Sequence, residues 1–313
     1  MSARILITEF MDEPAVAALA ARFDVRYEPA LADHANDIPG HLAGCAALIV
    51  RNRTQVTERL LDAGPRLRVV GRLGVGLDNI DVKACEARHI AVIPATGANA
   101  RAVAEYVIAT AMALLRGAYD STGAVATGQW PRAALSGGRE IHGKVLGLVG
   151  FGNIGRITAR LARGIGMRVI GFDPHVPASD AVWRDESVTS HPFADVVAQA
   201  DVLSLHVPLT PATRGLMDAE RLATMKADAV LINTARGGVV DEAALAAALH
   251  AGRLGGAALD VFATEPLPGG SPLAGCPHLI LTPHVAGVTR ESNARVSGSI
   301  AEQVAAALDG LRA

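Results

Sequence analysis

The sequence predicts an α/β protein built from two doubly wound parallel sheets with helices on both faces. Its 313 residues match the length of two domains. Short apolar runs alternate with alanine-rich helical patterns along the chain, which is typical of parallel sheets. Hydrophobic residues make up 50% of the sequence and aromatic residues only 4%, so we expect cores of Ala, Val, Leu and Ile.

The first part of the chain predicts five strands. The apolar runs are residues 4–7, 25–27, 47–50, 69–72 and 91–93. Helical patterns at residues 13–21 and 81–88 fall between strands, and a longer one at 100–117 follows them. The apolar stretch 103–115 is interrupted by Glu105 and is too short for a membrane span, so we expect a buried helix.

Residues 123–143 have weak periodicity and separate the first strand series from a second one. Tyr119 and Trp130 lie in or near this stretch, and we expect both to be exposed. A linker, an arm and a partner surface all fit its composition. The second series predicts strands at residues 145–149, 168–172, 202–206, 229–233, 256–260 and 279–282, and a last helix at 291–311.

Charge and cysteine content exclude several classes of protein. The 29 Lys and Arg residues nearly balance the 31 Asp and Glu residues, so the net charge of −2 offers no field for nucleic acid. The N-terminus lacks the pattern of a signal peptide. Cys45, Cys85 and Cys276 have no metal-ligand spacing, which predicts small buried residues rather than disulfides or a metal site. We expect a cytoplasmic protein without a membrane partner.

Gly150, Gly152 and Gly155 form a G-x-G-x-x-G pattern between a predicted strand, residues 144–149, and a predicted helix, 154–163. In that context the glycines allow a tight turn, and the helix amino terminus binds a pyrophosphate. Asp173 follows the next strand, where its carboxylate binds ribose hydroxyls and repels the additional phosphate of NADP. The alternative is a plain tight turn and a surface aspartate. The pattern predicts NAD as the cofactor.

This glycine pattern and four further motifs resemble those of the NAD-dependent D-isomer-specific 2-hydroxyacid dehydrogenases. The four are GRLGVGLDNID (71–81), HVPLTPATRGLMDAERLATMKADAVLINTARGGVVDEAAL (206–245), LDVFATEPLP (259–268) and TPHVAG (282–287). The resemblance covers nearly the whole chain. It implies two Rossmann-like domains, with an NAD-binding domain (99–286) inserted into a substrate-binding domain (1–98 and 287–313). It also implies a substrate cleft between them, and a homodimer, for which the long helix and residues 123–143 are the expected interface.

The resemblance further implies a catalytic set of Arg236, Glu265 and His284. A guanidinium after a buried strand suits the carboxylate and carbonyl of a 2-keto acid. We expect Gly237 and Gly238 to let substrate and cofactor approach. An imidazole that titrates near neutral pH suits proton transfer, and Glu265 would orient it and favour its charged form. The alternatives are a salt-bridged arginine, a structural histidine and a solvated acid.

The resemblance also assigns a larger set of residues to the cofactor. They are Gly150, Gly152, Asn153, Ile154, Gly155, Asp173, His206, Val207, Pro208, Thr213, Thr234, Ala235, Arg236, Asp260, His284 and Gly287.

Substrate contacts are expected from both parts of the chain, including Arg236 and His284. Backbone amides around Val75 and Gly76 are candidates for a carboxylate nest, with a simple tight turn as the alternative. Asn99 precedes the long helix and is expected to cap it. By resemblance it also faces the cleft.

The stretch IVRNRTQV (49–56) places Arg51, Asn52 and Arg53 after a predicted strand. Period-2 geometry would put both arginines on one face. The stretch resembles the segment with which phosphoglycerate dehydrogenases hold the phosphate of their substrate. We therefore expect a small 2-hydroxy acid with a second anionic group at C3, such as 3-sulfolactate or 3-phosphoglycerate. The alternative is that the arginines pair with surface carboxylates.

Three other functions fit the same motifs. Hydroxypyruvate or glyoxylate reduction needs no second anion. Formate and phosphite dehydrogenases use the same scaffold. An NAD-sensing corepressor of the same family would keep the catalytic set, although the sequence shows no added disordered tail or partner segment. In contrast to the phosphoglycerate dehydrogenases, we expect no regulatory domain after the core, which argues against a role in serine synthesis.

Overall fold

The computed structural model describes residues 3–310. The chain forms two compact units. The first unit contains the described residues up to Asn99 and those from Val288 onward, and the second unit is Ala100–Gly287. Residues 1–2 and 311–313 of the domain ranges expected above lie outside the described part. The chain therefore passes from the first unit into the second and back again.

The first unit contains a parallel sheet of five strands in the order β2-β1-β3-β4-β5. The strands are β1 (Arg4–Ile7), β2 (Asp24–Tyr27), β3 (Ala47–Val50), β4 (Val69–Arg72) and β5 (Ala91–Pro94). Its helices are α1 (Glu13–Ala20), α2 (Ile38–Leu42), α3 (Glu58–Asp62), α4 (Val82–Ala87) and α12 (Arg290–Gly310), with a 3-10 turn η1 (Leu31–His34). The order reverses between β1 and β3, and doubly wound sheets bind ligands at such a reversal.

Alternating side chains of these strands pack on opposite faces of the sheet. Ile5 and Ile7 lie with α1 and α12, whereas Leu6 packs with α2, α3 and α4. A Cβ at Gly71 would lie 2.8 Å from Val304 Cγ2, so a glycine lets α12 approach β4 closely. Helix α12 therefore completes a core whose strands all precede Asn99.

The second unit contains a parallel sheet of seven strands in the order β12-β11-β10-β9-β6-β7-β8. The strands are β6 (Val145–Val149), β7 (Arg168–Phe172), β8 (Thr189–Ser190), β9 (Val202–Leu205), β10 (Val230–Asn233), β11 (Gly256–Leu259) and β12 (Leu279–Leu281). Its helices are α5 (Ala100–Arg116), α6 (Thr122–Ala126), α7 (Asn153–Gly164), α8 (Ala181–Asp185), α9 (Phe193–Gln199), α10 (Ala219–Thr224) and α11 (Glu242–His250). The reversal lies between β6 and β9, so their carboxyl ends frame the ligand position expected of this fold.

Each face of this sheet has its own apolar core. Leu203 and Leu231 pack with α9, α10 and α11, while Val202 and Val230 pack with α5 and α7. Helix α5 is buried on one side only, because Met112 on its outer side is 46% exposed. The expectation of a buried helix therefore holds for one face of α5.

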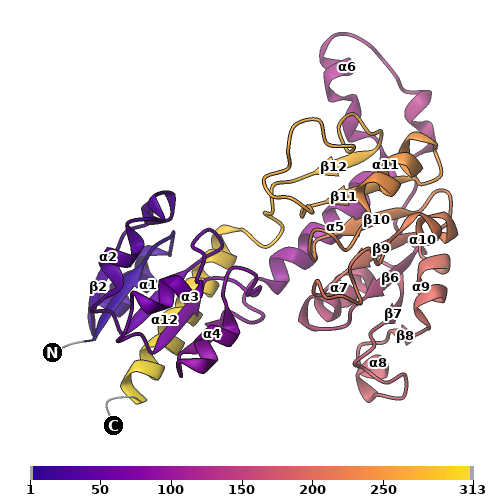
Figure 1. Ribbon diagram of the computed structural model, residues 1–313. Coiled ribbons are helices and arrows are strands. Elements are labelled where there is room, and N and C mark those ends of the chain that lie inside the picture. The colour runs from indigo at the N-terminus through magenta and orange to yellow at the C-terminus, as the bar shows by residue number, and fades with distance from the viewer. Residues whose placement is uncertain (1–2, 311–313) are drawn as a thin grey trace. The chain divides into compact units, whose positions relative to one another are not determined.

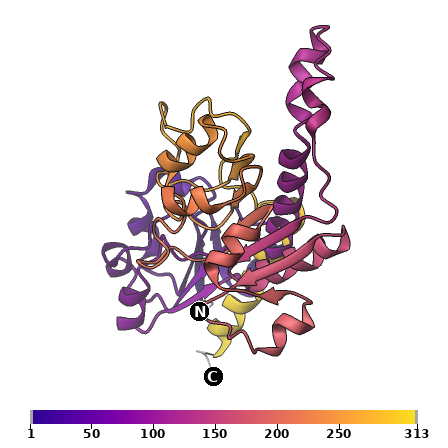
Figure 2. The ribbon, with the colours of Figure 1, turned by 90° about the vertical axis from the view of Figure 1, so that its right-hand side faces the viewer.

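Residues 117–144 form an extension of the second unit with two short 3-10 turns, η2 (Tyr119–Ser121) and η3 (Ala134–Gly137), beside α6. In Figures 1 and 2, α6 extends away from the sheet of its own unit. Tyr119 is 69% exposed and Trp130 is 77% exposed, as expected from the sequence. The extension thus presents large aromatic side chains to solvent.

The structure matches the expected parallel sheets and differs in two details. Strand β8 was not expected, because its two residues, Thr189 and Ser190, form no apolar run. Cys45 and Cys85 are buried, but Cys276 is half-buried, with its sulfur 3.5 Å from His250 Nε2. The three cysteines are free thiols. The expected helix at 291–311 corresponds to α12, and residue 311 lies outside the described residues.

None of the helices between residues 3 and 310 combines the length and hydrophobicity that a transmembrane span requires.

Candidate active site

The loop between β6 and α7 and the first turn of α7 contain three glycines with different surroundings. Gly150 has φ +99°, and a Cβ there would lie 2.3 Å from the carbonyl oxygen of His206. A Cβ at Gly155 would lie 2.4 Å from the Gly150 carbonyl oxygen. A Cβ at Gly152 would meet no atom within 4 Å. The first and third glycines therefore permit the turn, and the second leaves room for a ligand at the amino terminus of α7.

Asp173 lies directly after β7, beside this loop. Its Oδ2 accepts a hydrogen bond from the Phe151 amide at 2.7 Å, and its Oδ1 accepts one from the His175 amide at 2.9 Å. A carboxylate oxygen accepts more than one hydrogen bond, so both oxygens stay available to ribose hydroxyls. The bond to Phe151 also ties the end of β7 to the glycine loop.

Two buried polar atoms at the carboxyl edge of the same sheet have no hydrogen-bond partner within residues 3–310. They are Nδ1 of His206, after β9, and Oγ1 of Thr234, after β10. The other ring nitrogen of His206 lies 3.0 Å from Ser204 Oγ. Burial lowers the pKa of His206 to about 4, so its imidazole is neutral at pH 7. Because buried polar groups are normally paired, these atoms fit a polar ligand such as NAD at this edge.

The remaining residues assigned to the cofactor by resemblance lie on the same edge: Asn153 and Ile154 open α7, Val207 and Pro208 follow β9, Ala235 follows β10, and Gly287 ends the unit. Thr213, also assigned to the cofactor, has hydrogen bonds within the turn after β9. Its hydroxyl donates to the Pro208 carbonyl oxygen at 2.6 Å and accepts from the Thr210 amide at 2.8 Å. It therefore closes the turn after β9.

His284 and Glu265 form a close pair. Nδ1 of His284 lies 2.8 Å from Oε2 of Glu265, and Oε1 of Glu265 accepts a hydrogen bond from the Phe262 amide at 3.0 Å. Both side chains are accessible, with 46% of His284 and 35% of Glu265 exposed. Because Glu265 engages Nδ1, Nε2 is the ring nitrogen left for proton exchange with a ligand.

The backbone of His284 is left-handed, with φ +56°, which is uncommon for residues other than glycine. Its amide donates to the carbonyl oxygens of Asp260 at 2.9 Å and Thr282 at 3.0 Å. The Asp260 carboxylate, whose residue is 1% exposed, accepts from Thr282 Oγ1 at 2.6 Å and from the amides of Val285 and Ala286 at 2.8 Å each. Asp260 was expected to contact the cofactor. That contact stays a prediction, and the carboxylate itself is enclosed in the loop that carries His284.

Tyr106 of α5 extends this arrangement. Its hydroxyl lies 2.6 Å from Thr282 Oγ1, and Thr282 gives its own proton to Asp260, so Tyr106 is the donor. Burial raises the pKa of Tyr106. Helix α5 is therefore linked to the loop of His284 by two consecutive side-chain hydrogen bonds, which the sequence did not indicate.

Arg236 lies just beyond β10 and is half-buried. Its Nη1 donates to the Ala235 carbonyl oxygen at 2.6 Å. Asn233 holds the turn on both sides, because its Nδ2 donates to the Arg236 carbonyl oxygen at 3.0 Å and its Oδ1 accepts from the Ala235 amide at 3.0 Å. The guanidinium thus extends from a fixed turn at the carboxyl edge of the sheet.

Gly237 has a role that differs from the expected one. A Cβ at this position would lie 1.7 Å from the Phe262 carbonyl oxygen, so the glycine accommodates the protein's own backbone rather than a substrate. The contact brings the loop of Arg236 against the loop that ends in Glu265. Gly238 has φ +78° and allows the turn.

In the first unit, residues 51–53 follow β3 without continuing the strand. The shared face expected from period-2 geometry is therefore wrong. Arg51 Nη2 donates to Asn293 Oδ1 at 2.9 Å, whereas Arg53 forms an ion pair with Asp33. The two side chains have separate partners because the backbone amides of this loop turn around the carboxylate of Glu9.

The other substrate-binding candidates of the first unit are only partly as expected. The Gly74 amide donates to the Arg72 carbonyl oxygen at 2.7 Å, so Val75 and Gly76 are the positions of this loop left to offer amides. Asn99 does not cap the long helix. Its Oδ1 is buried and has no hydrogen-bond partner within the described residues.

Four polar residues that hold these loops were not predicted: Glu9, Asn79, Asn233 and Glu242. Glu242 accepts a hydrogen bond from the Ala263 amide at 2.7 Å. Asn233 was visible in the sequence as a polar residue at the end of an apolar run. The partners of Glu9 and Asn79 are far away in sequence, so no local pattern revealed them.

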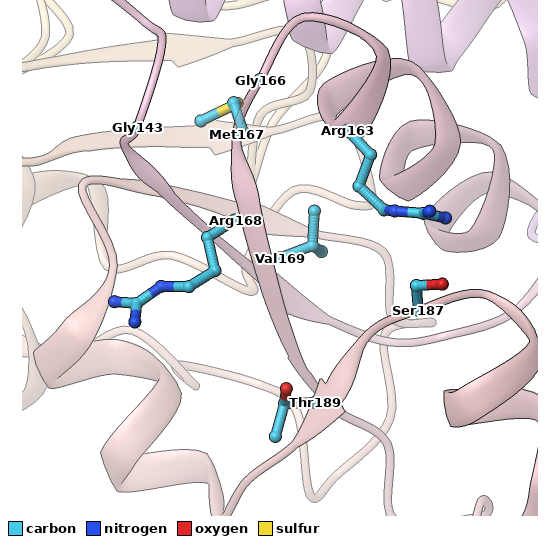
Figure 3. Close-up of a pocket in the computed structure, with 8 residues that line it drawn as sticks. All are labelled: Gly143, Arg163, Gly166, Met167, Arg168, Val169, Ser187 and Thr189. Carbon is cyan, nitrogen blue, oxygen red and sulfur yellow. The ribbon is translucent and has the colours of Figure 1, made fainter.

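A cavity of about 610 Å³ is lined by none of the residues assigned to the cofactor or the substrate (Figure 3). Gly143 and Arg168, which line it, stand at the amino ends of β6 and β7, the edge opposite to the glycine loop. Figure 3 shows the guanidinium groups of Arg163 and Arg168 pointing away from each other. Arg163 donates to the Glu186 carbonyl oxygen at 2.9 Å. This cavity is therefore not the cofactor site.

Known proteins resemble the chain along its whole length. The family model for the NAD binding domain of D-isomer specific 2-hydroxyacid dehydrogenases matches residues 108–286. A (S)-sulfolactate dehydrogenase of Chromohalobacter salexigens is 54% identical over 99% of both chains. A D-3-phosphoglycerate dehydrogenase of Mycobacterium leprae is 38% identical over 98% of this chain but only 57% of its own length.

Solved structures agree with this similarity. A glyoxylate reductase from Paecilomyes thermophila superposes with a TM-score of 0.87 at 28% identity, covering 98% of this chain and 96% of its own. The matches extend through both units and include the loops that contain Arg236, Glu265 and His284. The chain therefore belongs to the D-isomer specific 2-hydroxyacid dehydrogenase family and is an NAD-dependent oxidoreductase acting on CH–OH donors.

Proposed function

We propose that this protein transfers a hydride between NAD(H) and a small 2-hydroxy or 2-keto acid with a second anionic group at C3, as in 3-sulfolactate or 3-phosphoglycerate. The observation that carries the proposal is the 54% identity to a (S)-sulfolactate dehydrogenase over 99% of both chains. Arg51 and Arg53 after β3 supply two permanent positive charges for the second anion. The ion pair between Arg53 and Asp33 is half-exposed, so a substrate anion replaces it at little cost.

In the direction of oxidation, Nε2 of His284 takes the proton of the C2 hydroxyl while the hydrogen on C2 leaves as a hydride. NAD, when bound, supplies the acceptor for that hydride. Glu265 stabilises the imidazolium that results, and in reduction the same group returns the proton to the C2 oxygen. Arg236 binds the C1 carboxylate and polarises the C2 oxygen.

The two units have separate tasks in this proposal. The second unit binds NAD through the glycine loop, the carboxylate of Asp173 and the unpaired atoms of His206 and Thr234. The first unit recognises the substrate through Arg51, Asn52 and Arg53, the amides of Val75 and Gly76, and the amide of Asn99. The unpaired, buried Oδ1 of Asn99 supports its place near a ligand.

The experiment is a comparison of kcat/KM for sulfopyruvate, phosphohydroxypyruvate, hydroxypyruvate, glyoxylate and pyruvate. The wild type is compared with Arg53→Ala and with Arg26→Ala, an exposed arginine at the end of β2. In the wild type, kcat/KM is highest for the substrates with a second anion. In Arg53→Ala, kcat/KM for these substrates falls roughly 10- to 100-fold, which corresponds to the loss of one hydrogen bond to a charged group. Arg26→Ala leaves the order unchanged. The second-anion site is absent if the wild type has a kcat/KM for pyruvate at least as high as for the substrates with a second anion, and if Arg53→Ala causes no selective loss of kcat/KM for those substrates.

The second candidate function is reduction of hydroxypyruvate or glyoxylate. The observation that favours it is the structural match to a glyoxylate reductase over nearly the full length of both chains. The same substrate panel separates the two candidates, because a reductase of this kind prefers glyoxylate in the wild type and is indifferent to Arg53→Ala.

We also infer a homodimer in the cytoplasm. The extension at residues 117–144 supports the dimer, since it exposes Trp130 and Tyr119, and exposed aromatic residues are enriched at protein interfaces. The free thiols of Cys45, Cys85 and Cys276 support a reducing compartment.

A further inference from the structure

The carboxylate of Glu9 fills a nest of four consecutive backbone amides. Its Oε1 accepts from the amides of Arg51 at 2.8 Å and Thr54 at 3.0 Å, and its Oε2 accepts from those of Asn52 at 3.2 Å and Arg53 at 3.0 Å. Glu9 is 3% exposed. Burial alone would raise the pKa of Glu9, but the four amide bonds outweigh it, so the pKa lies below its usual value and the group is ionised.

The nest lies where the strand order of the first unit reverses. Glu9 follows β1 and residues 51–54 follow β3, and these two strands are neighbours whose carboxyl ends frame the reversal. Sheets of this order bind ligands at that point, and backbone nests bind anions. Here an internal carboxylate takes all four amides, so an anion next to residues 51–54 has to be bound by their side chains.

Other residues hold the opposite side of the same loop. Asn79 Nδ2 donates to the carbonyl oxygen of Thr54 at 2.7 Å and to that of Arg51 at 3.4 Å. The hydroxyls of Thr54 and Thr8 lie 2.8 Å apart, and both residues are buried. The four amides of residues 51–54 and the carbonyl oxygens of Arg51 and Thr54 are thus all hydrogen-bonded, which fixes the backbone of the loop from both sides.

This arrangement gives the two arginines fixed starting points. The Arg51 guanidinium donates to Asn293 on α12 and lies 5.8 Å from the centre of the Phe10 ring, whereas Arg53 extends to the exposed carboxylate of Asp33. A guanidinium binds a sulfonate or phosphate well only when its fork is aligned with the anion. The direction of both side chains depends on the loop, and the loop depends on Glu9.

We propose that Glu9 is the positioning residue of the second-anion site: it occupies the amide nest and so aims Arg51 and Arg53 at the C3 group of the substrate. The inference rests on the proposed function. Glu9 does not touch the substrate in this account. It acts through the backbone of residues 51–54 and excludes free anions from the nest.

The test compares the wild type, Glu9→Gln and Glu28→Gln with sulfopyruvate and glyoxylate as substrates. Glutamine replaces one acceptor oxygen by an NH₂ group, which leaves two amides of the nest without an acceptor. We expect kcat/KM for sulfopyruvate to fall roughly 10- to 100-fold through KM, while kcat/KM for glyoxylate falls far less and the NADH dissociation constant stays unchanged. Glu28→Gln removes an exposed carboxylate at the end of β2 and should match the wild type.

Glu9→Ala adds a measurement that a general loss of stability does not reproduce. Alanine empties the nest, and acetate fits the four amides that the side chain has left. Added acetate should restore sulfopyruvate turnover in Glu9→Ala and leave the wild type unaffected. If Glu9→Gln and Glu9→Ala do not fold, Asn79→Ala loosens the same loop from its carbonyl side and should show the same selective loss.

The outcomes separate the two proposals. Suppose that the wild type prefers sulfopyruvate and that Glu9→Gln lowers kcat/KM equally for sulfopyruvate and glyoxylate. This result overturns the role of Glu9 and leaves the proposed function standing. If Glu9→Ala folds and added acetate does not restore its sulfopyruvate turnover, the result also contradicts the proposed role of the occupied nest. A wild type that does not prefer sulfopyruvate overturns the second-anion function, and the positioning role falls with it.

Discussion

Two histidines of the second unit show how local surroundings separate similar side chains. His284 is accessible and has Nδ1 2.8 Å from the Glu265 carboxylate, which orients its ring. His206 has one ring nitrogen beside the Ser204 hydroxyl and the other buried, and burial lowers its pKa to about 4. The first is suited to carry a proton, and the second is suited to stay neutral next to a ligand.

The pair of His284 and Glu265 leads to a prediction for catalysis. His284→Gln should lower kcat of keto-acid reduction by roughly 10²- to 10⁴-fold, the usual contribution of a general acid. Glu265→Gln removes the carboxylate that orients the imidazole and should also lower this kcat, with an unchanged NADH dissociation constant as the control. A kcat at the wild-type level in Glu265→Gln would argue against the pairing.

His206 leads to a prediction for stability. Its folded pKa of about 4 lies below the ordinary value of 6.5, so below pH 6.5 the unfolded chain binds a proton that the folded chain does not. The free energy of unfolding of the NAD-free protein should therefore fall as pH is lowered from 6.5 to 4, with a contribution of at most about 1.4 kcal/mol per pH unit.

Urea unfolding of the wild type, His206→Gln and His175→Gln at several pH values measures this contribution. The slope should decrease in His206→Gln and persist in His175→Gln, which changes an exposed histidine of the same unit. If the free energy of unfolding has the same dependence on pH in His206→Gln and His175→Gln, His206 is not a buried, neutral imidazole.

At the scale of elements, glycines next to strands of the second unit serve different purposes. A Cβ at Gly152 meets open space within 4 Å, whereas a Cβ at Gly237 would lie 1.7 Å from the Phe262 carbonyl oxygen. Gly152→Ala should therefore fold like the wild type but bind NADH more weakly, because the methyl group occupies the approach to α7. Gly237→Ala should lower the melting temperature, because two loops are forced apart.

Thermal unfolding together with NADH titration of both variants checks this pair. A normal NADH affinity in Gly152→Ala would place the pyrophosphate elsewhere. An unchanged melting temperature in Gly237→Ala would mean that the two loops yield easily.

The elements were predictable where local patterns decide the structure. Strands such as β3 and β10 are fully buried, so their sequences are continuous apolar runs. The two-residue β8 has no such run and was missed. The Rossmann turn was predictable because its glycines carry the geometry themselves.

The site was predictable to a smaller extent. The motifs that contain Arg236, Glu265 and His284 could be read from the sequence, and the structure brings Glu265 and His284 into contact. The arrangement of Arg51 and Arg53 could not be read, because it depends on Glu9, more than forty residues earlier in the chain. The role of Gly237 depends on Phe262 in the same way. Contacts between distant loops leave no local pattern.

For the whole molecule, the extension at residues 117–144 leads to a prediction about assembly. Trp130 is 77% exposed on a segment that extends away from its own sheet (Figure 2). Trp130→Glu should lower the sedimentation coefficient of a dimer to that of a monomer, because a charge at the core of an interface is unfavourable. Gln129→Glu, next to it, serves as a control for added charge. A dimer that persists in Trp130→Glu would place the interface elsewhere.

The return of the chain to the first unit has a consequence for biosynthesis. The ribosome releases β1 to β5 first, but the side chains that cover one face of this sheet, such as Val304 and Ile300, belong to α12 and emerge after the second unit. Domains generally fold as units during translation. The second unit can therefore mature on the nascent chain, while the first waits with part of its apolar surface uncovered. Chaperones that act during translation should thus bind the early strands until α12 has left the exit tunnel.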